Sequence, residues 1–309
     1  MRTEPDRVTI LLGLRNGARF LPAQLDSLAR QEGCAWRLLV SDDGSTDRSR
    51  EIVADFARNR GGDRVELGAG PGLGFAENYR TMLAIQDGTG PLAFADQDDL
   101  WHTHRLARAI AALRELPPDC PALYCSAVRV MTGRRPEGPI WFRAVEPGFR
   151  HALVQNIAGG NTMVLNAAGA ALVAAAARLS GRFVSHDWFA YQIITAAGGR
   201  VIHDRFPGVL YRQHRHNTIG AAVGLAAQAR RARALLAGRY ARNLDIQLAA
   251  LARCRALMLP EAAALLDRIS EARAGGRLAT ARAVSAEGLH RAGRSGHAVL
   301  VAAALFGRL

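Results

Sequence analysis

The chain has 309 residues and carries 40 basic residues, all of them arginine, against 27 acidic residues, which gives a net charge of +13. This length suits one large domain with an appendage. The four cysteines lack Cys-x-x-Cys spacing, which argues against a disulfide framework and against a zinc site.

The N-terminal residues 1–6 are polar, and no stretch of the chain reaches the roughly 18 apolar residues that a membrane-spanning helix needs. We therefore expect neither a secretory signal peptide nor an integral membrane protein. Scattered, unpaired cysteines suit a reducing compartment, so the expected location is the cytoplasm.

The N-terminal part of the chain predicts strands that alternate with helices. Four short apolar runs predict the strands, at residues 8–14, 36–40, 64–67 and 91–95. Apolar residues at helical spacing follow each of the first three runs. This alternation predicts βαβ crossovers and a parallel sheet, in which the loops at the carboxyl ends of the strands gather along one edge. Ligands bind at that edge in such sheets.

Three carboxylates lie where the fourth predicted strand ends. Asp96, Asp98 and Asp99 occur within four residues, directly after the run 91–95. Close carboxylates repel one another, and a divalent cation that prefers hard oxygen ligands, Mg²⁺ or Mn²⁺, would offset the repulsion. The cluster alone supports an alternative equally well, in which Asp98 or Asp99 caps an amphipathic helix predicted over residues 101–116.

Polar side chains also follow the first two predicted strands. Asn16, Asp42 and Asp43 stand at their carboxyl ends, so we expect these residues to lie beside the acidic cluster. Carboxylates that converge from different loops favour a site for a metal and a nucleotide. The glycine-rich loop 68–74 lacks both the Gly-x-Gly-x-x-Gly register and a Walker lysine, and we interpret it as a turn rather than a phosphate cradle.

The second half of the chain divides into two parts. Further strands are predicted at residues 122–131, 200–202 and 209–211, a glycine turn and strand at 159–166, and helices at 167–177 and 188–197. After about Gly220 alanine, leucine and arginine dominate, and we expect helices broken near Gly238, Pro260, Gly275 and Gly293. We therefore predict one domain over residues 1–220 and a basic helical region over 221–309.

The C-terminal region has two interpretations. It holds 14 arginines against 5 acidic residues, and it contains nine consecutive apolar residues at 298–306. A basic region with a short apolar end suits an anionic membrane surface. Alternatively, these helices form a packed, solvated bundle. The first arginine cluster of the region comprises Arg230, Arg231, Arg233, Arg239 and Arg242.

Six short motifs span about residues 8 to 220. They are Arg15-Asn16-Gly17, Ser41-Asp42-Asp43-Gly44-Ser45-Thr46-Asp47, Gly74-Phe75-Ala76-x-Asn78, Asp96-Gln97-Asp98-Asp99-x-Trp101, Ser185-His186-Asp187-Trp188-Phe189 and Tyr211-Arg212-Gln213-His214-x-x-Asn217. Together they resemble family 2 glycosyltransferases of the GT-A fold. Within that family the motifs are most similar to bacterial rhamnosyltransferases that build cell-surface polysaccharides. The implied fold is Rossmann-like, with a mostly parallel central sheet flanked by helices and, here, a helical C-terminal extension.

The resemblance implies an inverting glycosyltransferase. It would move a sugar, L-rhamnose in the most similar branch, from a dTDP- or UDP-linked donor to a saccharide or lipid-linked acceptor. Such acceptors would place the protein at the inner face of the plasma membrane. Asp98 would ligate Mg²⁺ or Mn²⁺ that bridges the diphosphate, Asp96 would face the ribose or the metal, and Asp99 would assist or cap the next helix.

The resemblance also implies roles for other residues. The nucleoside-binding residues would be Leu14, Arg15, Asn16, and Asp42 or Asp43. Asp187 occupies the position of the general base, which takes a proton from the acceptor hydroxyl as that oxygen attacks the anomeric carbon. Without the motif, we would interpret Asp187 as an N-terminal helix cap.

Several residues have weaker implied roles. Arg212 and His214 are candidate contacts to the diphosphate or metal, or else belong to a basic surface hairpin. The segment 132–147 would be a mobile loop on the acceptor side. Candidate contacts to the donor or acceptor are Asn78, Trp101, Asn161 and Trp188.

Two other functions share some of these features. A nucleotidyltransferase acting on a sugar phosphate also uses a parallel sheet and an acidic metal loop, but it would carry a glycine-rich signature with arginine and lysine near the first strand, and this chain has no lysine. A non-catalytic nucleic-acid-binding protein would use the arginines. The C-terminal region, however, contains only Tyr240 and Phe306 as aromatic residues, so we expect no nucleic acid partner.

Overall fold

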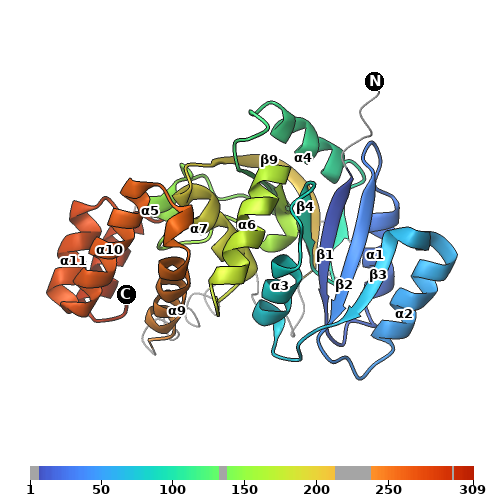
Figure 1. Ribbon diagram of the computed structural model, residues 1–309, viewed down its shortest axis with the longest axis horizontal. Helices are drawn as coiled ribbons and strands as arrows, with labels where there is room; N and C mark the ends of the chain where they lie inside the picture. The colour runs from blue at the N-terminus through green and yellow to red at the C-terminus, as the bar shows by residue number, and fades with distance from the viewer. Residues whose placement is uncertain (1–6, 132–137, 213–237, 294–295) are drawn as a thin grey trace.

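The computed structural model describes residues 7–131, 138–212, 238–293 and 296–309. In this part of the chain, a nine-stranded sheet runs through the molecule, and the C-terminal helices lie at one end of it (Figure 1). The strand order is β3-β2-β1-β4-β8-β6-β9-β5, and β7 pairs with β6.

The N-terminal half of the sheet is parallel, as the alternating pattern predicts. Its strands are β1 (Val8–Leu14), β2 (Trp36–Asp42), β3 (Val65–Ala69) and β4 (Leu92–Ala95), and the helices between them are α1 (Leu21–Ala29), α2 (Ser49–Phe56) and α3 (Phe75–Ala84). A π-helical turn at Ala57–Gly61 and a 3-10 turn at Gly62–Arg64 connect α2 to β3. The carboxyl ends of β1, β2 and β4 therefore meet at one edge.

The other half of the sheet mixes parallel and antiparallel pairs. Its strands are β5 (Leu100–Trp101), β6 (Ala122–Met131), β7 (Ile140–Trp141), β8 (Met163–Leu165) and β9 (Arg200–Arg212). Strand β8 is antiparallel to both β4 and β6, whereas β9 is parallel to β6. The two strands predicted at 200–202 and 209–211 form the single strand β9, which has an irregular register beside Ser126 and Ala127.

Helices cover both faces of the sheet because the buried side chains of β1 alternate. Leu11 packs with Tyr79 of α3 in one cluster, whereas Ile10 and Leu12 pack with Leu25 of α1 in the other. The remaining helices before residue 212 are α4 (Arg105–Arg114), α5 (Phe149–Ala152), α6 (Ala167–Leu179) and α7 (His186–Ala196), with a 3-10 turn at Gly160–Thr162.

One helix boundary differs from the prediction. The helix predicted from residue 101 begins at Arg105, because Leu100 and Trp101 form strand β5, which pairs with Leu210 and Val209 of β9. Among the described residues of segment 132–147, the predicted loop also contains the short strand β7.

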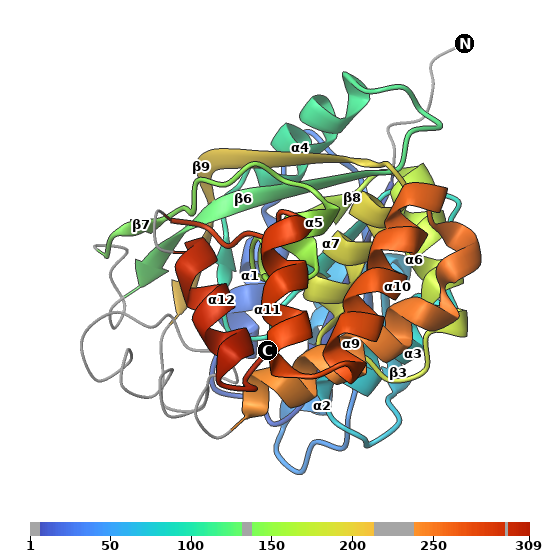
Figure 2. The same ribbon diagram turned by 90° about the vertical axis from the view of Figure 1, so that its left-hand side faces the viewer.

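In the described part of the C-terminal region, helix boundaries fall near Gly238, Pro260, Gly275 and Gly293, as the sequence predicts. The helices are α9 (Arg239–Arg253), α10 (Pro260–Ala274), α11 (Arg277–Ala286) and α12 (Gly296–Leu305), with a 3-10 turn at Arg255–Leu257. Figure 2 shows α9 to α12 side by side over α5 and α7. No helix in the described ranges is long and apolar enough to cross a membrane.

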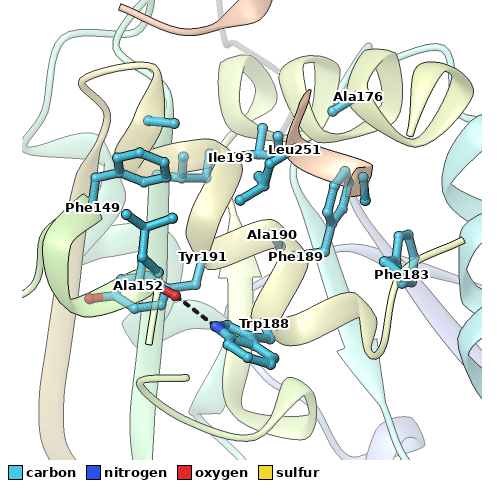
Figure 3. Close-up of a cluster of buried hydrophobic side chains, with 14 of the residues drawn as sticks. Phe149, Ala152, Ala176, Phe183, Trp188, Phe189, Ala190, Tyr191, Ile193 and Leu251 are labelled. Atoms are coloured by element: carbon cyan, nitrogen blue, oxygen red, sulfur yellow. Dashed lines mark hydrogen bonds between the residues drawn. The ribbon is translucent and has the colours of Figure 1, made fainter. Parts of the chain in front are cut away.

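The C-terminal helices share a core with the rest of the molecule. Leu251 of α9 packs in one cluster with Phe189 and Ile193 of α7, which is buried on nearly all sides (Figure 3). The packed-bundle interpretation of this region therefore holds for its described part. Arg230, Arg231 and Arg233 lie outside the described residues, whereas Arg239 and Arg242 lie on α9.

Candidate active site

A cavity of about 1540 Å³ opens at the carboxyl ends of β1, β2 and β4. Its walls come from the loops after these strands, from the turn Gly160–Thr162, and from the first residues of α7. Sites for one small molecule usually measure about 300–1,000 Å³. The cavity therefore has room for two ligands at once.

The acidic cluster lies in this cavity. Carboxylate oxygens of Asp96, Asp98 and Asp99 come within 4.8 Å of one another. Asp96 and Asp98 line the cavity, whereas Asp99 is fully buried below them. Asp99 accepts hydrogen bonds from the side-chain amide of Asn161 and, at 3.0 Å, from the backbone N–H of Arg212. Since the next helix begins at Arg105, neither Asp98 nor Asp99 caps it.

The environment of the cluster favours a cation. Burial and the neighbouring carboxylates raise the pKa of Asp96 well above its usual range. Burial and the charge of Asp98 raise the pKa of Asp99 to about 7. A divalent cation would offset this repulsion, and the carboxylates of Asp96 and Asp98 offer the hard oxygen ligands that Mg²⁺ and Mn²⁺ prefer. The residues present fit such an ion.

A buried arginine with no sequence motif of its own lies beneath the cluster. The guanidinium of Arg105 lies 3.6 Å from the centre of the Trp101 ring, and it donates a hydrogen bond of 2.7 Å to the backbone oxygen of Asn161. Its Nε and Nη1 have no hydrogen-bond partner among the described residues, and burial lowers its pKa to about 9. Trp101 itself packs in the core and does not line the cavity. Its predicted contact to donor or acceptor is therefore wrong.

Two further side chains hold the ends of β1 and β4 together. The register of these strands ends at Leu12 and Ala95. Beyond it, the hydroxyl of Tyr79 donates to Ala95 O at 2.7 Å and accepts from the N–H of Gly13 at 3.2 Å. These contacts satisfy backbone groups that the strands leave unpaired.

Gln97, in the middle of the acidic loop, completes this connection. Its Oε1 accepts from the backbone N–H of Arg15 at 2.9 Å, and its Nε2 donates to Arg15 O at 3.0 Å. The acidic loop is thus fixed to the loop after β1. Neither Tyr79 nor Gln97 was predicted from the sequence, because their contacts with Gly13 and Arg15 link residues 66 and 82 positions apart.

Of the adjacent residues Asp42 and Asp43, only Asp43 lines the cavity. Its carboxylate accepts hydrogen bonds of 2.7 Å from the N–H groups of Gly72 and Gly74. Both glycines have positive φ, so the glycine-rich loop is a turn folded around Asp43. Asp42 does not line the cavity, and it pairs with Arg50 at 3.0 Å.

The loop after β1 lies where the sequence predicts. Leu14, Arg15 and Asn16 all line the cavity. Asn16 has a φ of 49°, and its Oδ1 accepts from the N–H of Thr46 at 2.8 Å, which ties this loop to the loop after β2. Asn16 is the only non-glycine residue with positive φ in the described ranges.

Asp187 faces the same cavity from the start of α7. The N-cap of this helix is Ser185, so Asp187 is not the cap. Its Oδ2 accepts from the N–H of Gly160 at 3.2 Å, and its Oδ1 accepts from the N–H of Trp188 at 2.7 Å. The two bonds fix the orientation of the carboxylate.

His186 lies beside Asp187 but does not bond to it. Its ring stacks on Tyr79, with the centroids 3.7 Å apart, and contacts the edge of Phe94. Burial lowers its pKa to about 4, and neither ring nitrogen has a hydrogen-bond partner among the described residues. A Cβ atom on Gly160 would lie 2.3 Å from His186 Nε2, so this position requires glycine.

The remaining predicted residues have varied positions. Asn78, Asn161 and Trp188 line the cavity, but their polar groups bond within the protein: Asn78 to Ser41, Asn161 to Asp99, and Trp188 to Ala152 O at 2.7 Å (Figure 3). Arg212 does not line the cavity.

Arg212 nevertheless acts on the acidic loop. Its Nε donates to Asp98 O at 2.9 Å, and its guanidinium lies 4.8 Å from the centre of the Phe20 ring. It therefore supports the position of Asp98 through the backbone. His214 lies outside the described residues.

Comparison with known proteins points to one family. The sequence pattern described as glycosyl transferase family 2 matches residues 9–177, which include the acidic cluster. The dTDP-rhamnosyl transferase RfbG of Shigella flexneri is 25% identical over 231 residues, which cover 70% of this chain and 76% of RfbG.

Two solved structures share the fold. TarS 1–349 from S. aureus has a TM-score of 0.51 at 14% identity, and the match covers 86% of this chain and 87% of that one. The mannosyltransferase PcManGT from Pyrobaculum calidifontis, solved in complex with GDP-Man and Mn²⁺, has a TM-score of 0.51 at 17% identity, with 99% and 86% covered.

Proposed function

Because the chain belongs to glycosyl transferase family 2, we propose that it transfers a sugar from a nucleoside-diphosphate donor to a hydroxyl group of a saccharide or lipid-linked acceptor in polysaccharide synthesis. One observation carries the proposal. Asp96 and Asp98 line the same cavity as Asp187, and Asp43 lies in its wall as well. The fold is the GT-A fold that the motifs predict.

We propose a dTDP- or UDP-linked donor, with L-rhamnose as the first candidate sugar. The similarity to the dTDP-rhamnosyl transferase RfbG supports this choice. Asp43 and the loop residues Leu14 to Asn16 would bind the nucleoside. Arg15 and Arg19, which also line the cavity, would attract the diphosphate.

In the proposed mechanism, Asp98 and Asp96 would hold Mg²⁺ or Mn²⁺. When bound, this cation would stabilise the charge that develops on the departing diphosphate. Asp99, Asn161 and Arg212 fix the loop that presents the two carboxylates. The complex of PcManGT with Mn²⁺ supports the choice of cation.

Asp187 would act as the general base. Hydrogen bonds from Gly160 and Trp188 each use one carboxylate oxygen, and the remaining lone pairs can take the proton of the acceptor hydroxyl. The acceptor oxygen would attack the anomeric carbon on the face opposite to the diphosphate, so the configuration inverts in a single displacement.

We also propose that the C-terminal helices contact an anionic membrane surface, at the cytoplasmic face of the plasma membrane. Leu278 of α11 and Phe306 after α12 are 65% and 73% exposed. The helix ends meet here, because a Cβ atom on Gly307 would lie 3.1 Å from Cδ of Arg277. Apolar side chains beside arginine suit the interface of an anionic bilayer.

The family match lends no support to nucleotidyl transfer or to nucleic-acid binding. A panel of dTDP-, UDP- and GDP-sugars tests the proposal directly. Each donor is incubated with the chain, Mn²⁺ and octyl glycosides of common hexoses as acceptors, and released nucleoside diphosphate is measured. At least one donor should give acceptor-dependent release. No release with any donor would overturn the proposed function.

A further inference from the structure

One helix of the C-terminal region reaches the cavity. Asn243 of α9 is among the residues that line it. The last motif of the family resemblance ends at Asn217, so α9, at Arg239–Arg253, lies beyond the part of the chain to which those motifs assign roles. The C-terminal region, predicted from the sequence to be a separate appendage, therefore supplies part of the wall of the cavity.

A buried glutamine fixes α9 in this position. Oε1 of Gln247 accepts from the backbone N–H of Val184 at 2.7 Å, and its Nε2 donates to Oε1 of Gln192 at 2.6 Å. Gln247 is fully buried. Val184 precedes Asp187 by three residues, and Gln192 lies on the same helix as Asp187. Gln247 therefore holds both the segment that leads into α7 and α7 itself.

The hydrogen bonds continue to the other side of α7. Nε2 of Gln192 donates to Ala152 O at 3.1 Å, and the same oxygen accepts from Nε1 of Trp188, as Figure 3 shows. Trp188 directly follows Asp187. The helices α5 and α9 therefore fix α7, which carries the candidate base, through hydrogen bonds on two sides. Buried networks of this kind keep side chains in a single arrangement when every member is satisfied.

Asn243 is placed by the same helix. It precedes Gln247 by four residues, so the two side chains share one face of α9. Asn243 is half-buried, and its amide makes no hydrogen bond with any residue in the described ranges. An amide group offers both donors and an acceptor. It thus presents unused hydrogen-bonding groups to the cavity beside α7.

The position of α9 favours the acceptor over the donor. The proposed nucleotide end of the site is built by the loops after β1, β2 and β4, whereas α9 packs against the opposite side of α7 (Figure 1). Asp187 at the start of α7 would remove a proton from the acceptor. A group on the α9 side of Asp187 is therefore placed to contact the acceptor sugar.

We propose that α9 forms the acceptor-facing wall of the active site, in which Asn243 binds a hydroxyl group of the acceptor and Gln247 is a positioning residue for Asp187. The inference rests on the proposed function. It identifies the acceptor's contacting part as a polyhydroxylated sugar, because a neutral amide pairs with hydroxyl groups.

The first test replaces Asn243 with alanine. The donor and the octyl glycoside are those that give the highest rate with the unsubstituted chain. The KM for the octyl glycoside should rise about three- to tenfold, which is the effect of one lost hydrogen bond, while the donor Kd stays unchanged. The neighbouring exposed residue gives a matched control, Arg242→Gln, which should leave both constants unchanged.

Other results would overturn the assignment. An unchanged acceptor KM would remove Asn243 from the site, and a weaker donor Kd would place it on the donor instead. An inactive unsubstituted chain would count against the proposed function, whereas an active chain with an unaffected Asn243→Ala variant counts only against this inference.

A second pair of variants tests Gln247. Gln247→Leu loses both hydrogen bonds, whereas Gln247→Glu keeps an acceptor for the N–H of Val184. We expect kcat to fall at least tenfold in the leucine variant, with partial recovery in the glutamate variant and an unchanged donor Kd in both. Equal kcat values in the three proteins, or a kcat loss matched by an equal loss of donor affinity, would contradict a positioning role.

Discussion

At the level of single residues, the acidic loop presents two carboxylates to the cavity and encloses the third. Asp96 and Asp98 face the cavity, whereas Asp99 is enclosed by Asn161 and Arg212. Burial, together with the neighbouring carboxylate charges, raises the pKa values of Asp96 and Asp99. We therefore expect a cation to bind in the cavity beside the carboxylates of Asp96 and Asp98.

Replacing Asp98 with alanine should abolish transfer in Mg²⁺ or Mn²⁺ and leave the fold intact, because the loop carboxylate contributes little to the core. Initial rates with and without excess EDTA measure the effect. Asp63→Ala, an exposed carboxylate away from the cavity, is the matched control and should keep the parent rate. Full activity of the Asp98 variant, or of the parent chain in EDTA, would contradict the metal assignment.

Tyr79 should stabilise the site and the fold together. In Tyr79→Phe, Ala95 O and the N–H of Gly13 lose their hydroxyl partner. Leaving buried backbone groups unpaired costs about 1–3 kcal/mol, so the free energy of unfolding in urea should fall by that amount. A variant as stable as the parent would show that the hydroxyl does not hold β1 to β4.

His186 should make stability depend on pH. Its pKa in the folded protein is about 4, below the value of about 6.5 expected in the unfolded chain. Because the folded pKa is lowered, the unfolded state binds more protons as the pH falls below 6.5, and the folded state loses stability until about pH 4. Burial, which favours the neutral ring, is the physical cause.

His186→Phe keeps a ring between Tyr79 and Phe94 but removes the titration. Between pH 7 and 4.5, the parent should lose about 2–3 kcal/mol more unfolding free energy than the variant, measured by urea titration at both values. Parallel losses in the two proteins would show that His186 is protonated in the folded state.

Among the helices, α7 links the motifs to the C-terminal region. It carries Asp187 at its first turn and packs on α9 through buried apolar contacts. An isolated C-terminal fragment would expose the α9 surface that α7 covers. Membrane binding by these helices is therefore tested on the full chain.

We predict that the full chain binds vesicles of anionic phospholipid and that binding weakens as salt rises, because screening reduces the contribution of about 1 kcal/mol from each arginine near the surface. Co-sedimentation measures it. Phe306→Ser should reduce binding. Ile85→Ser removes an equally exposed apolar side chain outside the C-terminal region and should not. Equal binding by both variants would exclude the proposed surface.

Over the whole molecule, local patterns predicted most of the fold. The strands β1, β2 and β4 form from buried apolar runs, and the starts of α9 after Gly238 and of α10 at Pro260 follow from backbone chemistry. Strand β5 was missed because its two residues form a strand only by pairing with β9, more than 100 positions away.

The site was predicted less completely than the fold. Motifs placed Asp43, Asp98 and Asp187 at one cavity, as the structure shows. The sequence did not point to Arg105 or Asn243. Arg105 has its role because it is buried under the acidic loop, and Asn243 reaches the cavity only because α9 packs on α7. Long-range contacts of this kind leave no periodicity in the chain.

Asp187 is central to the proposed mechanism, in which its carboxylate removes the acceptor proton during sugar transfer. Transfer to an octyl glycoside is measured by mass spectrometry for the parent and for Asp187→Asn, and the donor Kd is measured by calorimetry with Mn²⁺. We predict glycosylated product for the parent, a rate about 10²- to 10⁴-fold lower for the variant, and similar donor Kd values. A variant that transfers sugar at close to the parent rate would contradict the account.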